Sequence, residues 1–166
     1  FARLVDQLKR RMAAQFEFDV FISYTNRDEK IASAWRTALR EAGLRVYMSQ
    51  PDAMRKFKNE IELALAESLV MMPFVSDRAA GPDGQKGWVQ REIEYRKTLF
   101  DEDHCNILPV ELTRGLAAVF ADGFSAVAAS EDNQDEIPTV IEAVRAVKAG
   151  AKSPPYATRR KSGLKI

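Results

Sequence analysis

A tryptophan, Trp88, and a glutamate, Glu92, stand four residues apart near the middle of the chain. If this stretch is helical, the indole ring lies beside the carboxylate, because residues four apart share one face of a helix. Val89 and Ile93 form the neighbouring apolar stripe, which we expect to anchor the helix in a core while the first stripe faces elsewhere. The pair therefore offers a flat apolar wall next to an anion, which suggests a site without fixing its chemistry.

Strand-like and helix-like segments alternate about five times along the chain and must position this pair. Strands are expected at residues 18–23, 44–48, 69–76, 106–112 and, more weakly patterned, 124–128; helices are expected at 28–42, 58–68, 88–100, 113–120 and 135–148. This alternation predicts a parallel sheet with helices on both faces and right-handed crossovers. Ligands bind such sheets at the carboxyl ends of the strands. We therefore expect the loops after Ser23, Met48 and Ser76, together with the start of the Trp88 helix, at one rim.

Turn-forming residues separate these segments. Asp28 is a plausible N-cap for the first long helix, and Gly43 ends it. The segment 49–57 is expected to be a loop, because Pro51 and its polar neighbours end the second strand. Residues 77–87 are expected to form a loop with little intrinsic order, since they include three glycines and a proline.

The composition is that of one soluble globular domain: 166 residues, 46% hydrophobic and 30% charged. No apolar run approaches the ~20 residues that a membrane span needs. The formal net charge of +1 argues against a surface built wholly to hold a polyanion. Cys105 is the only cysteine, which excludes an internal disulfide and is compatible with a reducing compartment. The chain starts with Phe1 and has no signal-peptide pattern, so we expect a fragment or a trimmed protein.

The two ends differ in pattern from the middle. Residues 3–14 predict an amphipathic helix that docks on the domain or leads in from an upstream one. Beyond Ala149, prolines, glycines and basic residues without any acidic residue predict an extended tail, which we interpret as solvated rather than bound to nucleic acid. The chain is thereby divided into a lead-in helix or linker (1–17), a main domain (18–148) and a basic tail or linker (149–166).

Several other chemistries find little support. His104 and Cys105 are adjacent and no matching pair exists elsewhere, so no metal site is expected. Ser23 and Ser76 have no histidine nearby in sequence, and the chain has one histidine in all, which makes a serine triad improbable. Neither a Gly-x-Gly-x-x-Gly motif nor a Walker-type loop is present, which argues against a Rossmann dehydrogenase and a nucleoside triphosphatase.

Three motifs in register resemble the Toll/interleukin receptor (TIR) domain family. They are the first strand with Tyr24, the third strand ending in Ser76, and the Trp88–Glu92 pair, and the similarity covers about residues 18–148. The resemblance implies a flavodoxin-like three-layer α/β fold, with a central five-stranded parallel sheet flanked by helices.

In the NAD-cleaving members of this family, which include bacterial, plant and axon-degeneration enzymes, the glutamate of this pair is catalytic. The resemblance therefore implies this role for Glu92 and packing of Trp88 against the substrate. It also implies substrate contacts for the following residues: Ser23, Tyr24, Thr25, Asn26 and Phe57.

The sequence departs from its relatives in three places. Ser49 stands where an acidic residue is common, and Thr25 and Asn26 stand where the axon enzyme has basic residues. The loop after the second strand has residues 54–56, Met-Arg-Lys, where many relatives have Pro-Gly or Gly. These differences leave the Trp88–Glu92 pair itself intact and bear instead on the pose of the nucleotide and on the way the loop opens.

One carboxylate can be enough to cleave NAD. Ordinary glycosides need an acid to protonate a poor leaving group, whereas nicotinamide leaves as a neutral ring from a cationic one. An anion near the ribose can then stabilise the positive charge that grows at C1′, most strongly in a dry site. Attack by water gives ADP-ribose, and attack by the adenine or a ribose hydroxyl gives a cyclic isomer; the sequence does not select between them.

The resemblance thus implies a cytoplasmic NAD glycohydrolase or cyclase, an effector of bacterial antiphage immunity that is activated by oligomerisation through TIR–TIR contacts. NAD is its substrate, a sensor domain is its fused or separate partner, and we expect no cofactor, no membrane contact and no direct binding of nucleic acid by the core. A non-catalytic TIR module for homotypic assembly stays open, because of the altered loop at 49–57 and the basic tail. So does a nucleoside-processing enzyme of related fold.

Overall fold

A five-stranded sheet forms the centre of the computed structural model, which describes residues 2–4, 16–49, 54–81, 87–101 and 104–150. All strand pairs are parallel, and the strand order is β2-β1-β3-β4-β5. The strands are β1 (Phe18–Ser23), β2 (Val46–Met48), β3 (Ser68–Val75), β4 (Val110–Glu111) and β5 (Val127–Ala128).

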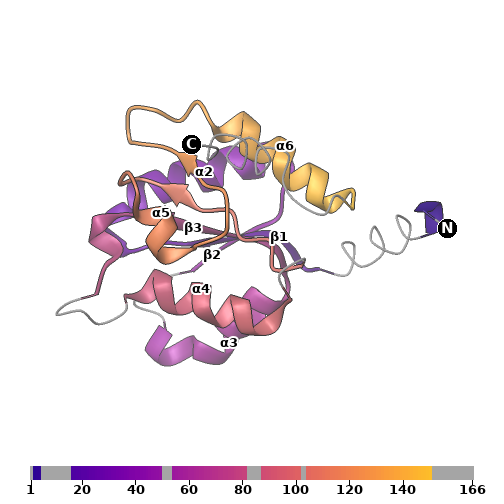
Figure 1. Ribbon diagram of the computed structural model, residues 1–166, viewed down its shortest axis with the longest axis horizontal. Coiled ribbons are helices and arrows are strands. Elements are labelled where there is room, and N and C mark those ends of the chain that lie inside the picture. The colour runs from indigo at the N-terminus through magenta and orange to yellow at the C-terminus, as the bar shows by residue number, and fades with distance from the viewer. Residues whose placement is uncertain (1, 5–15, 50–53, 82–86, 102–103, 151–166) are drawn as a thin grey trace.

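Helices cover both faces of this sheet (Figure 1). On one face lie α2 (Glu29–Glu41) and α6 (Ile137–Lys148), and on the other lie α3 (Met54–Ala66), α4 (Trp88–Leu99) and the short α5 (Leu116–Phe120). Two 3-10 turns, η1 (Asn26–Asp28) and η3 (Asp77–Ala79), follow β1 and β3. The predicted flavodoxin-like architecture, a five-stranded parallel sheet between helices, is confirmed.

The alternation of side chains along β1 divides the interior into two cores. Val20 and Ile22 are fully buried in the core under α2 and α6, whereas Phe21 is fully buried in the core under α3 and α4. Successive side chains of a strand point to opposite faces, so a strand covered on both sides is apolar throughout. The same reason explains β3, in which all eight residues are buried.

The clearest differences from the predicted boundaries concern β4, β5 and α3. The strand expected over 106–112 pairs as an isolated bridge between Ile107 and Met71 and then as the two residues of β4, because Pro109 between them has no N–H to donate. The last strand is likewise confined to two residues. Helix α3 begins at Met54 and not at residue 58, since residues 54–57 contain no glycine or proline and include good helix formers.

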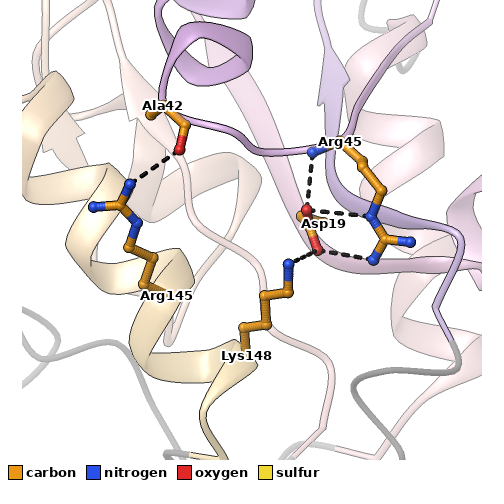
Figure 2. A network of polar contacts seen from close by, with 5 residues as sticks. All are labelled: Asp19, Ala42, Arg45, Arg145 and Lys148. Carbon is orange, nitrogen blue, oxygen red and sulfur yellow. Dashed lines mark hydrogen bonds and ion pairs between the residues drawn. The ribbon is translucent and has the colours of Figure 1, made fainter.

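At the amino end of β1, a buried carboxylate ties three segments together (Figure 2). Asp19 accepts hydrogen bonds from the backbone N–H of Arg45 (2.8 Å) and from its guanidinium (3.1 Å), and it lies 3.2 Å from the ammonium of Lys148. Nearby, Arg145 donates to the carbonyl of Ala42 at 3.0 Å. Burial would raise the pKa of Asp19, but the bonds from Arg45 and Lys148 outweigh it and lower that pKa. These contacts fasten the end of α6 to β1 and to the turn after α2.

Most of the predicted lead-in helix, beyond residue 4, lies outside the described residues, as does the tail from residue 151 onward. The domain boundaries at 17 and 149 therefore stay predictions. Within the described ranges, no helix combines the length and the apolar character that crossing a membrane requires.

Candidate active site

The start of α4 is held against the loop that follows β3 by a close approach at Gly87. A Cβ built on Gly87 would lie 2.0 Å from the carbonyl oxygen of Ala79 and 3.0 Å from the backbone nitrogen of Gly81. No other residue fits there without moving the backbone, so this glycine sets where the helix begins. Gly87 therefore has a packing role within a segment whose composition indicated little order.

Helix α4 faces two environments, as its spacing indicated. Val89 and Ile93 are fully buried in the core with Phe21 and Ile61. Glu92 is also buried, at 2% exposure. It lies at the carboxyl ends of the strands, where its carboxyl group has polar contacts. The stripe of α4 that carries Glu92 is thus buried as well. The sequence predicted only that this stripe faces away from the apolar one.

Two serine hydroxyls hold the carboxyl group of Glu92. Ser23, the last residue of β1, donates to Oε1 at 2.7 Å, and Ser49, which directly follows β2, lies 3.2 Å from Oε2 and 3.4 Å from Oε1. Both serines are fully buried. Since β1 and β2 are neighbours and run in parallel, their carboxyl ends present these hydroxyls side by side to the same group.

The surroundings favour the neutral form of Glu92. Burial raises its pKa from 4.5 to about 8, and the hydrogen bonds from Ser23 and Ser49 and the nearby indole of Trp88 only partly oppose this rise. No cation in the described part of the chain forms an ion pair with Glu92. The carboxyl is thus protonated at neutral pH in the free protein, and the arrival of a positive charge would ionise it.

Trp88 supplies an apolar wall with one unused donor. Its indole N–H is buried and makes no hydrogen bond with any residue that the structure describes, although the ring lies close enough to Glu92 to favour the charged carboxylate. A buried donor without a partner is costly. A hydroxyl or carbonyl oxygen of a ligand next to Glu92 would satisfy it.

A groove of about 470 Å³ runs between α3 and α4 and includes Glu92. Each helix contributes one stripe at the spacing of residues that share a helix face. The lining residues are Lys58, Ile61, Glu62 and Leu65 from α3, and Trp88, Arg91, Glu92 and Tyr95 from α4. The volume falls in the range of small-molecule sites.

The structure brings some of the predicted site residues together and separates others. Ser23, Trp88 and Glu92 meet at the rim. Tyr24 is buried in the core on the opposite face, with Ile22 and Trp35, because the alternation of β1 continues one residue beyond the strand. Its ring therefore faces away from the groove.

Of the other three predicted contacts, Thr25 and Asn26 lie outside the groove, and the side chain of Phe57 is outside the described part of the structure. Thr25 is half-buried, and its carbonyl accepts the backbone N–H of Asp28 at 2.8 Å; Asn26 is exposed, and neither residue lines the groove. The backbone of Phe57 belongs to α3, but its side chain is outside the described part of the structure.

A second polar cluster at the rim has no counterpart in the sequence prediction. Asp28 is 1% exposed and accepts hydrogen bonds from Ser76 (2.5 Å) and from the guanidinium of Arg78 (2.8 Å). It occupies the N-cap position of α2, as expected, but makes no capping bond with its side chain, since those two donors take its oxygens. The cluster joins the turns after β1 and β3 and so supports the rim beside Glu92.

Ser49 is the site residue that the sequence did not assign. Its position in the sequence could have indicated this contact, because Ser49 is a small polar residue directly after a strand, at the rim where ligands bind. For a metal, in contrast, the described ranges contain no group of three or more His, Cys, Asp or Glu residues that could hold one. His104 contacts Asp101 at 2.5 Å, and Cys105 is buried beside them in sequence.

Comparison with known proteins gives a family and a number of solved structures that match this chain. The family model of the TIR domain matches residues 20–143. No curated protein matches the sequence. Among solved structures, diflavin flavoprotein A3 from Nostoc sp. is similar at 11% sequence identity, over 87% of this chain and 96% of that chain, with a TM-score of 0.49.

Proposed function

The chain belongs to the TIR domain family, and from this premise and the surroundings of Glu92 we propose that it cleaves the bond between nicotinamide and ribose in NAD. One observation carries the proposal. A glutamate at the carboxyl ends of the strands is buried beside Trp88, held by two hydroxyls, and without an ion pair in the described residues. Such a group is poised to meet a cation, and the nicotinamide ring of NAD is one.

Binding of the substrate would change the charge of Glu92. The cationic ring next to the carboxyl lowers the pKa of Glu92 from its value of about 8, because an opposite charge within a few ångströms favours the ionised form. The proton leaves to solvent. Ser23 and Ser49 keep donating to the carboxylate and hold it in place, and the flat ring of Trp88 keeps water from the departing nicotinamide.

The cleavage step then moves the positive charge from the ring to the ribose. The bond between C1′ and the ring nitrogen breaks, and its electron pair stays with nicotinamide, which leaves neutral. The carboxylate of Glu92 stabilises the cation that forms at C1′ in a site of low dielectric constant. Water then adds to C1′ and loses a proton to give ADP-ribose. If an adenine nitrogen or a ribose hydroxyl adds instead, loss of a proton from the attacking group gives a cyclic isomer.

The family supports the wider role within this proposal. The protein acts in the cytoplasm as an effector of bacterial antiphage immunity, and assembly through TIR–TIR contacts, driven by a sensor domain, switches on NAD cleavage. The two reaction outcomes would act differently in the cell: hydrolysis to ADP-ribose depletes NAD, whereas cyclisation makes a nucleotide signal.

Release of nicotinamide from NAD tests the proposal. Wild-type protein at high concentration, with and without a crowding agent that promotes assembly, is compared with Glu92→Gln at pH 8, and nicotinamide is measured by chromatography. We expect a loss of about 100-fold or more in Glu92→Gln, since one stabilising group of this kind typically contributes that much.

Glu94→Gln is the matched control, because Glu94 is exposed on the same helix and does not line the groove. It should retain the wild-type rate. Equal rates in wild type and Glu92→Gln, or no release under any assembly condition, would contradict the proposal and favour an assembly module.

A further inference from the structure

The groove between α3 and α4 continues well past the carboxyl group that the proposed cleavage uses. Trp88 lies in the first turn of α4 and Tyr95 lies seven residues later, which corresponds to about 10 Å along the helix. Ile61 and Leu65, both buried, form the floor of this extension. Something longer than a nicotinamide riboside is needed to fill it.

Arg91 places a positive group in this groove, at nearly the same height on α4 as Glu92. It is the residue before Glu92, it lines the same groove, and its guanidinium makes no hydrogen bond or ion pair with any described residue. Other arginines nearby are engaged: Arg78 binds Asp28, and Arg96 donates to four backbone carbonyls. A free, planar guanidinium beside an apolar floor matches the oxygens of a phosphate, which it can bind with two parallel hydrogen bonds.

Lys58 faces the groove from α3 and adds a second positive charge. Its nearest acid is Glu62, at 3.8 Å, and both side chains have access to solvent. An exposed pair of this kind contributes little energy, so the ammonium can turn toward a ligand at low cost. With Glu92 neutral, Arg91 and Lys58 outweigh Glu62, and this part of the groove is electropositive.

We propose that Arg91 and Lys58 bind the diphosphate of the dinucleotide, and that the adenosine lies along the apolar floor toward Tyr95. The inference rests on the proposed function, because it takes NAD as the ligand. Glu92 then faces the cationic nicotinamide end of NAD, and Arg91, which lines the same groove from the adjoining side of α4, faces the anionic diphosphate.

The probe that tests this is ADP, which contains the diphosphate and adenosine but no nicotinamide. Its dissociation constant is measured by calorimetry for wild type, Arg91→Ala, Arg91→Lys and Lys58→Ala, with adenosine as the ligand that lacks phosphate. We expect Arg91→Ala to weaken ADP binding by about tenfold or more, Lys58→Ala to weaken it less, and Arg91→Lys to restore part of the affinity.

Lys30→Ala is the matched control, since it removes one exposed positive charge from α2, on the other face of the sheet. It should change the affinity for ADP by less than about twofold, because solvent screens so distant a charge. Adenosine binding should be the same in all variants. Unchanged affinity of Arg91→Ala for ADP, an equal loss of adenosine and ADP binding, or no ADP binding to wild type at millimolar concentration would each overturn the inference.

The same variants separate this inference from the proposed function. If wild type releases no nicotinamide but ADP binding depends on Arg91, NAD cleavage fails and the diphosphate site stands. If NAD is cleaved while Arg91→Ala changes neither the KM for NAD nor the affinity for ADP, the diphosphate site fails alone.

Discussion

Asp19 and Glu92 are both buried carboxyl groups, and their surroundings shift their pKa values in opposite directions. Asp19 is the second residue of β1, and Glu92 contacts the last residue of the same strand. Asp19 is 1% exposed and Glu92 is 2% exposed. Asp19 has Arg45 and Lys148 as partners, and its pKa is lowered in spite of burial. Glu92 has two hydroxyls, and its pKa is raised to about 8. Burial alone therefore does not decide the charge of a carboxyl group here; the partners do.

The difference also separates a structural role from a chemical one. A carboxylate with its counter-charges in place links segments of the fold, as Asp19 links β1 with the end of α6 (Figure 2). A carboxyl group without them costs stability when it ionises, and it gains most from a ligand that brings a cation. Functional sites commonly hold groups of the second kind.

Arg96 is an arginine on the same helix that could pair with Glu92 but does not. It lies one turn further along α4, at a spacing where a glutamate and an arginine can pair. Its guanidinium is buried and instead donates to the carbonyls of Leu65, Ser68, Leu69 and Cys105. Burial lowers the pKa of Arg96 to about 10, so it stays charged at neutral pH. Its charge serves the amino end of β3 and leaves the rim to Glu92.

Of the substitutions that test this difference, Glu92→Gln should change the free energy of unfolding the most. The folded protein keeps the Glu92 proton between pH 4.5 and about 8, where the unfolded chain has lost it, so rising pH destabilises the wild type in this window. Glu92→Gln removes this term. We expect the stability of the variant relative to wild type to grow by about 1.4 kcal/mol per pH unit across the window, or about 3–5 kcal/mol in all.

Urea denaturation of both proteins at pH 5, 6, 7 and 8 measures this difference, since all other titrating groups cancel between them. A difference that does not change with pH would mean that Glu92 ionises normally in the fold.

Asp19→Asn should lower the free energy of unfolding, and this change should be smaller than the one expected for Glu92→Gln. Asp19→Asn loses charged hydrogen bonds to partners that are half-exposed, and we expect a loss of about 2 kcal/mol at pH 7. The folded pKa lies below 3.8, so this stabilisation is present above pH 3.8 and disappears as the pH falls through the folded pKa. Denaturation at pH 7 and near pH 3 checks both statements.

Asp122→Asn, which changes an exposed aspartate, is the control and should alter stability by less than about 0.5 kcal/mol. If Asp19→Asn were as stable as wild type at pH 7, the two carboxyl groups would not differ as described.

Removing the hydroxyls around Glu92 should have the smallest effect. Both serines stabilise the charged carboxylate, so Ser23→Ala and Ser49→Ala should each raise the pKa of Glu92 further, by about one unit or less. Ser23→Ala should shift it more, because its contact is shorter, at 2.7 Å against 3.2 Å. The pH midpoint of the stability difference from Glu92→Gln reports the shift, and a lowered pKa in either variant would refute this role of the serines.

Features set by local pattern could be predicted from the sequence. The periodicity around Val89 and Ile93 predicted a helix and its core face, and the apolar run of β3 predicted a buried strand. The placement of Ser23 and the start of α4 at one rim followed from the topology of parallel sheets. The alternation along β1 continues to Tyr24, on the face of Val20 and Ile22, so the substrate contact that the resemblance implied for Tyr24 ran against this local pattern.

Features that depend on contacts between distant segments could not be predicted. Ser49 meets Glu92 across 43 positions of sequence, and Arg96 reaches the carbonyl of Leu65 across 31. No local pattern distinguishes these side chains from solvated ones on a helix or in a loop. The burial of Glu92 arises in the same way, from the packing of α4 against two neighbouring strand ends.

A direct titration of the Glu92 carboxyl group tests the central claim of this account. Protein with ¹³C-labelled glutamate is titrated by NMR, with Glu92→Gln to assign the signal, first alone and then with a non-cleavable NAD analogue whose ribose ring oxygen is replaced by a methylene. We expect a midpoint near 8 in the free protein, and a lower one when the cationic ring binds. A midpoint near 4.5 in the free protein, or one that stays the same or rises with the bound analogue, would contradict it.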